Sequence, residues 1–390
     1  GSRRGLTWIT ARVIRVQLKD TKDQVESISE DVRNRLITGA TEALDIDREL
    51  EELGRLYREW SREPRRGLIA LTGDRGAGKS RLMAHLSSIF DVEQENASPI
   101  DMVRIQCPQR SMNEEESLVW LAESLGLELE SPDRVSLVAA LENHPPTLWA
   151  VDDLHRSFRR SVGGFEGLVS LLDAMYATSR RHFWILNIHE PAWAYLKGVP
   201  GAVNLAVFRE RVMIRRLEPS RARTWLEGRA ESAGIRLDYG KLVGESLPGV
   251  DLERALSRAR DAFWRLLVQF SQGNPRIALQ YWTNSLCAHE QPDAVHTVLF
   301  DAPAPADLSD VGDLELFVLT ALIIHDGLHL DDLAAVLNLA EGECHRLCSQ
   351  LEARGVLQAD DYGSRFSVEL GWLPAVERTL QQKHFLYAQA

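Results

Sequence analysis

Hydrophobic positions follow two different periods along the chain. Short, mostly apolar runs that end in polar residues indicate buried strands at 68–71, 102–106, 148–153, 182–189 and 211–215. Between these runs the apolar residues recur every three or four positions, as they do in amphipathic helices. Strands that alternate with helices in this way predict a parallel sheet with helices on both faces.

Beyond residue 218 only the helical period continues. It predicts helices at 220–233, 252–270 and 276–287, then a proline-containing linker over 292–308. Residues 309–390 have the pattern of a winged helix, with helical spacing at 316–323, 331–337 and 341–354 and short strands at 356–358 and 366–368. Cys344 and Cys348 lie on the apolar stripe of the third helix, so we predict core residues rather than metal ligands.

The residues before the first strand are more charged. Residues 44–57 have one apolar face and predict a helix, and residues 19–40 predict a connector helix or a short coiled coil. Residues 1–18 carry four arginines and no acid among apolar residues. This segment could pack on the body of the protein, lie on a membrane surface or follow a removed transmembrane helix. Gly1-Ser2 resembles a cloning scar, so we expect the natural chain to begin upstream.

A glycine-rich loop joins the first predicted strand to a helix. Residues 73–80 match the P-loop pattern G-x-x-x-x-G-K-[ST] in full. Such glycines let backbone N–H groups turn inward around phosphates, and the helix N-terminus adds partial positive charge. We expect Lys79 to reach the β- and γ-phosphates of a nucleoside triphosphate and the Ser80 hydroxyl to hold Mg²⁺. The residues predicted to contact the nucleotide are Gly73, Asp74, Arg75, Gly76, Ala77, Gly78, Lys79, Ser80 and Arg81.

Polar side chains close two later strands. Asp152 and Asp153 follow the apolar run 148–151. Because parallel strands end at one edge of the sheet, these acids should lie beside the P-loop, where Asp152 would hold Mg²⁺ through water and Asp153 would polarise the attacking water. Asn187 lies near the end of the strand 182–189. Its amide could orient that water or touch the γ-phosphate, or it could be hydrogen-bonded into a neighbouring loop.

One arginine occupies an unfavourable helical position. Gly273-Asn274-Pro275 stops one predicted helix and starts the next, which places Arg276 in a first turn. A cation there opposes the helix dipole, so either an anionic ligand or a surface salt bridge would explain it. We include Arg276 among the predicted nucleotide contacts.

Composition and charge narrow the choice of partner. The chain has 44% hydrophobic and 26% charged residues and a net charge of −12, so no global attraction to nucleic acid is expected. Four cysteines without a disulfide-like spacing favour a reducing, cytoplasmic setting, whether for this chain alone or for the soluble part of a longer or membrane-associated protein. No apolar run is long enough to span a bilayer.

The predicted winged helix is itself acidic. Residues 311–390 contain twelve acids against five Lys and Arg residues, and its turn carries Asp360-Asp361. Phosphate contact normally dominates DNA affinity, so this surface favours a protein partner. Arg156, Arg159 and Arg160 follow the acidic strand end and could contact DNA, form a solvated turn or contact another subunit.

These motifs together resemble the AAA+ ATPases over residues 42–380. The resemblance is to the branch shared by origin-recognition and helicase-loader ATPases and the signal-transducing STAND ATPases. It implies an α/β fold: a three-layer αβα P-loop core with a parallel sheet, then a helical lid and a C-terminal winged helix. It identifies Walker A at 73–80 and Walker B at Asp152-Asp153. It further implies sensor 1 at Asn187, sensor 2 at Arg276, an arginine finger at Arg209 or Arg211, and an adenine-bordering segment at Asp47-Arg48-Glu49-Leu50.

The resemblance and the charge pattern lead to two functional hypotheses. Asp153, where most AAA+ motors have Glu, resembles STAND proteins, whereas Asn187 and Pro275-Arg276 resemble initiators and loaders. The first hypothesis is a slow, Mg²⁺-dependent ATPase that forms homo-oligomers through its ATP site and controls a protein partner. The alternative is a DNA-binding initiator or helicase loader. The predicted domains are 1–41, 42–218 (ATPase core), 219–300 (lid) and 301–390 (winged helix).

Overall fold

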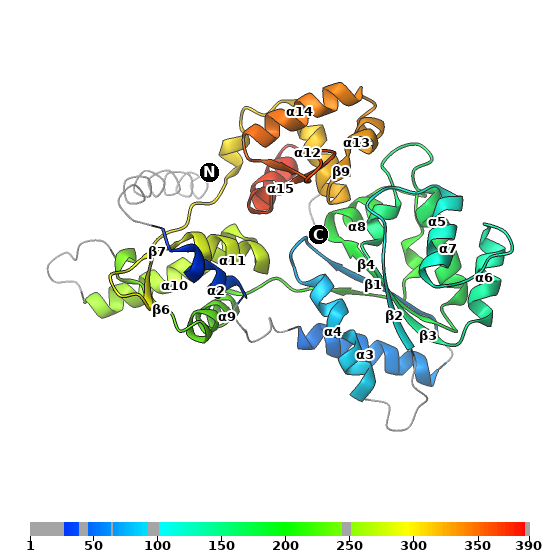
Figure 1. Ribbon diagram of the computed structural model, residues 1–390, viewed down its shortest axis with the longest axis horizontal. Coiled ribbons are helices and arrows are strands. Elements are labelled where there is room, and N and C mark those ends of the chain that lie inside the picture. Colours follow the sequence, from blue (N-terminus) through cyan, green and yellow to red (C-terminus); the bar gives the residue numbers. More distant parts are fainter. Residues whose placement is uncertain (1–26, 39–45, 64, 93–100, 244–250, 387–390) are drawn as a thin grey trace. The chain divides into compact units, whose positions relative to one another are not determined.

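The computed structural model describes residues 27–38, 46–63, 65–92, 101–243 and 251–386 (Figure 1). They form two compact units. One unit contains helix α2 (Glu30–Thr38) and the region Arg216–Ala304. The other contains the described residues from 46 to 215 and those from 305 onward. The membrane-surface hypothesis for residues 1–18 falls outside the described residues and stays a prediction, as does the four-part division of the chain.

The larger unit is built on a five-stranded sheet. Its strands are β1 (Gly67–Gly73), β2 (Asp101–Gln106), β3 (Thr147–Asp152), β4 (Phe183–His189) and β5 (Glu210–Met213). They lie in the order β2-β3-β4-β1-β5, and every neighbouring pair is parallel. β1 and its neighbour β4 are buried throughout, as expected for strands covered on both faces.

Helices cover both faces of this sheet. They are α3 (Asp47–Arg62), α4 (Lys79–Val92), α5 (Glu114–Ser124), α6 (Arg134–Asn143), α7 (Glu166–Thr178) and α8 (Glu190–Gly198). Because side chains alternate along a strand, Leu68 and Ala70 pack toward α5–α8, whereas Ile69 and Leu71 pack toward α3 and α4. The predicted three-layer αβα core is therefore confirmed.

The C-terminal part of the larger unit is a winged helix, as predicted. It consists of α12 (Asp313–His325), β9 (Leu328–His329), α13 (Leu330–Leu337), α14 (Glu341–Ala353), β10 (Leu357–Ala359), β11 (Arg365–Val368) and α15 (Leu373–Gln382). Its strands form the antiparallel order β10-β11-β9. Cys344 and Cys348 are buried within it, so they are core residues of the domain as the helical stripe predicted.

The smaller unit differs from the helix-only prediction. Besides α9 (Pro219–Ser232), α10 (Leu252–Phe270) and α11 (Pro275–Asn284), it contains β6 (Arg236–Asp238), β7 (Leu286–Ala288) and β8 (Ala294–Thr297) in the order β6-β8-β7. The predicted helix to residue 287 and the linker from residue 292 were therefore wrong at these strands. Three- and four-residue strands are too short to show a period-2 pattern, and their pairing is set by contacts distant in sequence.

Helix α6 begins at Arg134, and the Asp133 side chain, which accepts the Ser136 N–H, is its cap. In the smaller unit, α2 packs on the lid helices: Arg229 Nε donates to Leu36 O at 2.9 Å and Arg33 to Asn284 Oδ1 at 3.2 Å. The predicted connector is thus an integral part of that unit. No helix among the described residues is both long and apolar enough to cross a membrane.

Candidate functional site

The P-loop lies between β1 and α4 at the carboxyl edge of the sheet, where the sequence predicted it. Gly76 and Gly78 have φ of 82° and 106°, a backbone region that favours glycine. A Cβ at Gly78 would have no heavy atom within 4 Å, so the loop is open on that side. This open, glycine-turned loop at a helix N-terminus has the geometry that phosphates require.

Lys79 is buried at the base of the loop. Its Nζ donates to Gly73 O at 2.8 Å and to Asp74 O at 2.9 Å. Burial lowers the pKa of Lys79 below its ordinary value, although Asp326 and other nearby acids oppose the shift. The ammonium is held by backbone carbonyls and therefore has a defined position within the loop.

Asp152 ends β3, which β4 separates from β1, and is 1% exposed. It is one of the nearby acids that oppose the lowering of the Lys79 pKa. Its Oδ2 accepts from Arg104 Nη2 at 2.5 Å, and its Oδ1 accepts from the Asn187 amide. Ser80 is exposed in the first turn of α4. A hydroxyl and a carboxylate are the hard oxygen donors that Mg²⁺ prefers, so this pair fits the predicted metal chemistry. Both Asp152 oxygens already have partners, which is compatible with contact to the ion through water, and the metal roles of Ser80 and Asp152 stay predictions.

Asp153 follows Asp152 in a left-handed conformation, with φ 56° and ψ 38°. Its Oδ2 accepts from Gln106 Nε2 at 2.9 Å and lies 2.8 Å from Arg156 Nη2. Burial raises the pKa of Asp153 above its ordinary value, and Arg156 only partly offsets this effect. A carboxylate with a raised pKa accepts protons more readily, which suits a general base.

Asn187 is fully buried on β4, next to β3. Its amide donates to Asp152, not to a neighbouring loop, and its Oδ1 has no hydrogen-bond partner among the described residues. An unpaired buried carbonyl oxygen is costly and indicates an absent donor such as water or a ligand.

The two candidate arginine fingers both have partners within the unit. The Arg209 guanidinium is paired with Glu59, and its N–H donates to Leu68 O, which places it at the amino edge of the sheet. From there its own P-loop is about five residues, or roughly 16 Å, further along β1. Arg211 donates to Thr72 Oγ1 at 2.9 Å and pairs with Glu190 at 2.5 Å. Arg209 therefore lies away from the P-loop of its own chain, whereas Arg211 bonds the residue directly before Gly73 and lies close to that loop.

The remaining predicted contacts come from other elements of the chain. Arg276 is exposed in the first turn of α11, capped by Asn274, and belongs to the smaller unit. Its role toward the nucleotide therefore stays a prediction. In the segment predicted to border the adenine, Glu49 is buried and lies 3.1 Å from Arg215 Nε.

The sequence analysis missed an acid from the winged helix at this site. Asp326, the residue that ends α12, lies 3.6 Å from Arg75 Nε and 4.0 Å from Arg156 Nη2. Burial alone would raise the pKa of Asp326, but His189, Arg75 and Lys79 outweigh burial and hold it below its ordinary value. Asp326 is therefore an ionised carboxylate within the cationic environment of the P-loop.

Further contacts attach the winged helix to the core. Arg75 Nη1, predicted to contact the nucleotide, donates to Val368 O at 2.9 Å in β11. Arg159 Nη1 lies 3.1 Å from Asp332 Oδ1. The rings of Phe158 and His325 have centroids 4.9 Å apart. The arginine run 156–160 is therefore not a solvated turn: its side chains join the acidic strand end to the winged helix.

Buried histidines surround this junction. His189, at the end of β4, is buried, and desolvation lowers its pKa to about 4. Desolvation likewise lowers the pKa of His325 to about 3 and that of His155 well below its ordinary value. These rings are therefore neutral at neutral pH. His189 lowers the pKa of Asp326 only where its own ring is protonated, at low pH, and at neutral pH the positive charge around Asp326 comes from Arg75, Arg156 and Lys79.

No periodicity or motif could have indicated the winged-helix contacts. Asp326 and Gly327 have φ of 54° and 101°, which identifies a helix end but carries no information about what the carboxylate faces. The partners Arg75 and Arg156 are separated from Asp326 by 251 and 170 positions (326 − 75 and 326 − 156).

Comparisons with known proteins agree with the core geometry. A family model described as an AAA domain matches residues 62–193, so this part of the chain is an AAA domain, as the motifs predicted. No curated protein matches the sequence.

Several solved structures are similar over most of the chain. The Aeropyrum pernix ORC1 protein in complex with DNA is 14% identical, with 90% of this chain and 97% of that one covered at a TM-score of 0.43. Drosophila ORC bound to DNA is 15% identical, with 90% of each chain covered and a TM-score of 0.41. Cdc6p from Pyrobaculum aerophilum is 14% identical, with 92% and 99% covered and a TM-score of 0.36. At these identities and TM-scores no property of these proteins is transferred to this chain.

Proposed function

We propose that this protein is an AAA+ ATPase that acts as a nucleotide-dependent switch, with its winged helix as the element that ATP displaces. The observation that carries the proposal is Asp326, a carboxylate of the winged helix that is 16% exposed and lies beside Arg75 and Arg156 and close to Lys79. These cations surround the loop to which we assign the phosphates.

The nucleotide half of the site follows from the residues around the P-loop. Its N–H groups and Lys79 would bind the phosphates, and Ser80 and Asp152 would hold Mg²⁺, which neutralises phosphate charge during hydrolysis. Asp153 would orient the attacking water and take its proton.

A bound γ-phosphate and Asp326 would compete for the same cations. Two unit charges about 4 Å apart repel by about 4 kcal/mol at an effective dielectric constant near 20. Moving a two-state equilibrium from 1:99 to 99:1 takes about 5.5 kcal/mol. Repulsion by a multiply charged phosphate, with loss of the Arg75 and Arg156 contacts, is of that size. ATP binding would therefore release the winged helix.

Oligomerisation would complete the hydrolytic site. Arg209 lies at the amino edge of the sheet, away from the P-loop of its own chain, so as an arginine finger it would act on the site of a neighbouring subunit. Arg211, which bonds Thr72 beside the loop, is the second candidate for that role. Each would first give up an ion pair, Arg209 with Glu59 and Arg211 with Glu190. Hydrolysis would then depend on assembly, and a released acidic winged helix would be available to a protein partner.

Replacing Asp326 with alanine tests the switch. We expect Asp326→Ala to bind ATP about tenfold more tightly, or better, because the competing carboxylate is gone. We also expect faster amide hydrogen exchange in α12 and β11 without nucleotide, whereas the unmodified protein should show this increase only with ATP. Calorimetry and exchange mass spectrometry measure the two effects.

Asp331→Asn is the matched control, since Asp331 is an exposed acid of the same domain. It should change neither ATP affinity nor exchange. Unaltered ATP affinity in Asp326→Ala would exclude the competition while leaving the ATPase assignment intact.

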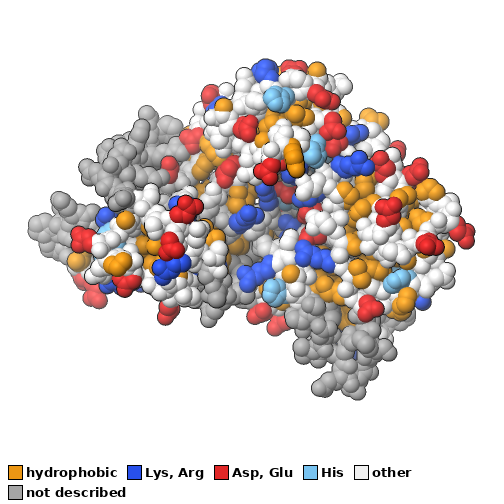
Figure 2. Space-filling model, viewed as in Figure 1, with side chains coloured by type: hydrophobic (Ala, Val, Ile, Leu, Met, Phe, Trp, Pro, Cys, Tyr) orange, Lys and Arg blue, Asp and Glu red, His pale blue; other side chains and the backbone are white. Residues whose placement is uncertain are grey.

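A DNA-binding initiator or loader is the second candidate, and the winged-helix fold is the observation in its favour. Against it, Arg156 and Arg159 are already paired with Asp153 and Asp332. The visible face of the winged helix also carries more acidic than basic side chains (Figure 2). Titration of duplex DNA at increasing salt discriminates: we expect no binding at physiological salt. A linear fall of log K with log salt, with a slope near −0.9 per phosphate contact, would instead support DNA.

A further inference from the structure

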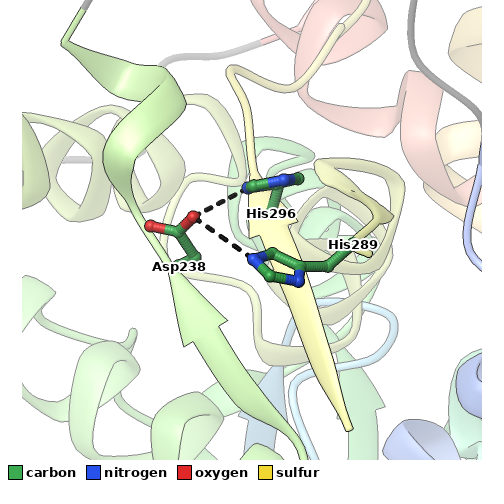
Figure 3. A group of neighbouring side chains, drawn as sticks. All are labelled: Asp238, His289 and His296. Carbon is green, nitrogen blue, oxygen red and sulfur yellow. Dashed lines mark ion pairs between the residues drawn. The ribbon is translucent and has the colours of Figure 1, made fainter. Parts of the chain in front are cut away.

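Two imidazoles and a carboxylate converge on the small sheet of the lid unit (Figure 3). Asp238 ends β6, and His296 lies beside it on β8, in register. His289 follows the last residue of β7 and points back toward the same carboxylate. Side chains from β6, from β8 and from the residue after β7 thus lie close together, and none of them belongs to the ATP site.

The donor atoms have the spacing of a metal site. Asp238 Oδ2 lies 2.8 Å from His296 Nδ1 and 3.8 Å from His289 Nε2, and all three donors fall within 4.8 Å of one another. Ligands at about 2.0–2.2 Å around a tetrahedral ion are about 3.3 Å apart. The two observed separations lie on either side of that value, so small side-chain rotations would fit an ion.

The close approach between Asp238 and His296 is not a well-aligned hydrogen bond. His296 Nδ1 is buried, and among the described residues it has no partner that meets the angular requirement of a hydrogen bond. An ion bound to both atoms would give this buried nitrogen a partner.

Surrounding groups orient the ligands. The Gly240 N–H donates to Asp238 Oδ1 at 2.8 Å, which leaves Oδ2 to face the histidines.

One contact opposes metal binding. The Gln291 N–H donates to His289 Nδ1 at 2.9 Å, so the proton of the neutral ring lies on Nε2, the atom that faces Asp238. A metal at Nε2 requires the other tautomer and the loss of this hydrogen bond. We therefore expect micromolar affinity, weaker than that of a fully preformed site.

We propose that Asp238, His289 and His296 bind one divalent transition metal of the zinc class, with water as the fourth ligand. Two imidazoles and one carboxylate are a nitrogen-rich donor set that Zn²⁺ prefers over Mg²⁺. A bound ion would cross-link β6, β8 and the residue after β7. Strands of three and four residues form a weak sheet by themselves, so this metal cross-link would stabilise the lid unit.

The test is Zn²⁺ binding by tag-free protein freed of metal with a chelator. Excess Mg²⁺ in the buffer occupies oxygen-only sites such as the ATP site. We expect uptake of one Zn²⁺ per chain at micromolar concentration, a higher melting temperature with Zn²⁺, and visible absorption of the Co²⁺-substituted protein that is typical of tetrahedral coordination.

Variants separate this site from other binding. Asp238→Asn can still accept the Gly240 N–H, and His296→Ala removes one imidazole; each should weaken Zn²⁺ binding at least tenfold. Glu290→Gln, an exposed acid next to His289, is the control and should bind Zn²⁺ normally. Metal-free melting curves check that each variant folds. The proposal fails if the unmodified protein takes up no Zn²⁺, or if folded Asp238→Asn and His296→Ala bind it as well as Glu290→Gln does.

Discussion

Lys79→Ala is expected to abolish ATP binding, lowering affinity by about a hundredfold or more. The Lys79 ammonium is the buried cation within the loop, and Gly73 O and Asp74 O hold it in place. Arg75 of the loop is no ready substitute for Lys79, because it is already paired with Asp326 and bonded to Val368 O. A hundredfold loss corresponds to about 2.7 kcal/mol, within the range for one desolvated charge–phosphate contact. Calorimetric titration with a slowly hydrolysed ATP analogue measures the effect.

A control variant and a stability measurement make this result interpretable. Lys197→Ala, which removes an exposed lysine from α8 of the same unit, should leave nucleotide affinity unchanged. Lys79 is buried and its pKa is lowered, so its loss also removes a desolvation cost, and we expect a change in unfolding free energy of only about 1 kcal/mol. Near-normal ATP affinity in a folded Lys79→Ala protein would contradict the assignment of the loop.

Asp153→Asn is expected to reduce ATP hydrolysis by about a hundredfold or more while leaving ATP binding intact. The amide has the size of the carboxylate and keeps one oxygen for Gln106 or Arg156, but it cannot accept a proton from water. The ATP-bound form should then accumulate as the larger assembly. Single-turnover phosphate release measures the chemical step, and light scattering with and without ATP measures size.

Asp101→Asn, which alters an exposed acid at the start of β2, provides the control, because it lies at the edge of the sheet opposite the loop. It should hydrolyse ATP at the normal rate. Hydrolysis that persists in Asp153→Asn would show that another group acts as the general base. Loss of ATP binding in that variant would show instead that Asp153 holds the site together through Gln106 and Arg156.

The parts of the fold that the sequence predicted well are those with a strong local signal. Strands β1, β3 and β4 are buried on both faces and therefore appear as nearly continuous apolar runs. The third helix of the winged helix carries an apolar stripe that includes Cys344 and Cys348. In both cases burial alone determines the residue pattern, so the pattern in turn predicts which residues are buried and which element they form.

The small sheet of the lid unit had no such signal. Its strands β6 and β7 have three residues each, and Leu286 and Cys287 of β7, which follow α11 closely, continue a helical spacing. Whether they extend the helix or pair with β8 depends on partners elsewhere in the chain. The neighbouring Asp238, His289 and His296 were missed for the same reason, because their spacing of 51 and 7 residues (289 − 238 and 296 − 289) matches no local metal-binding motif.

The sequence by itself therefore determined the P-loop to which we assign the phosphates. A P-loop needs its glycines, lysine and serine consecutive between a strand and a helix, and parallel strand order then brings Asp152, Asp153 and Asn187 to the same edge. Only the tertiary structure decided what else faces that site. The docking of Asp326 on Arg75 and Arg156 depends on charges far apart in the chain, which become neighbours only once the winged helix has packed on the core.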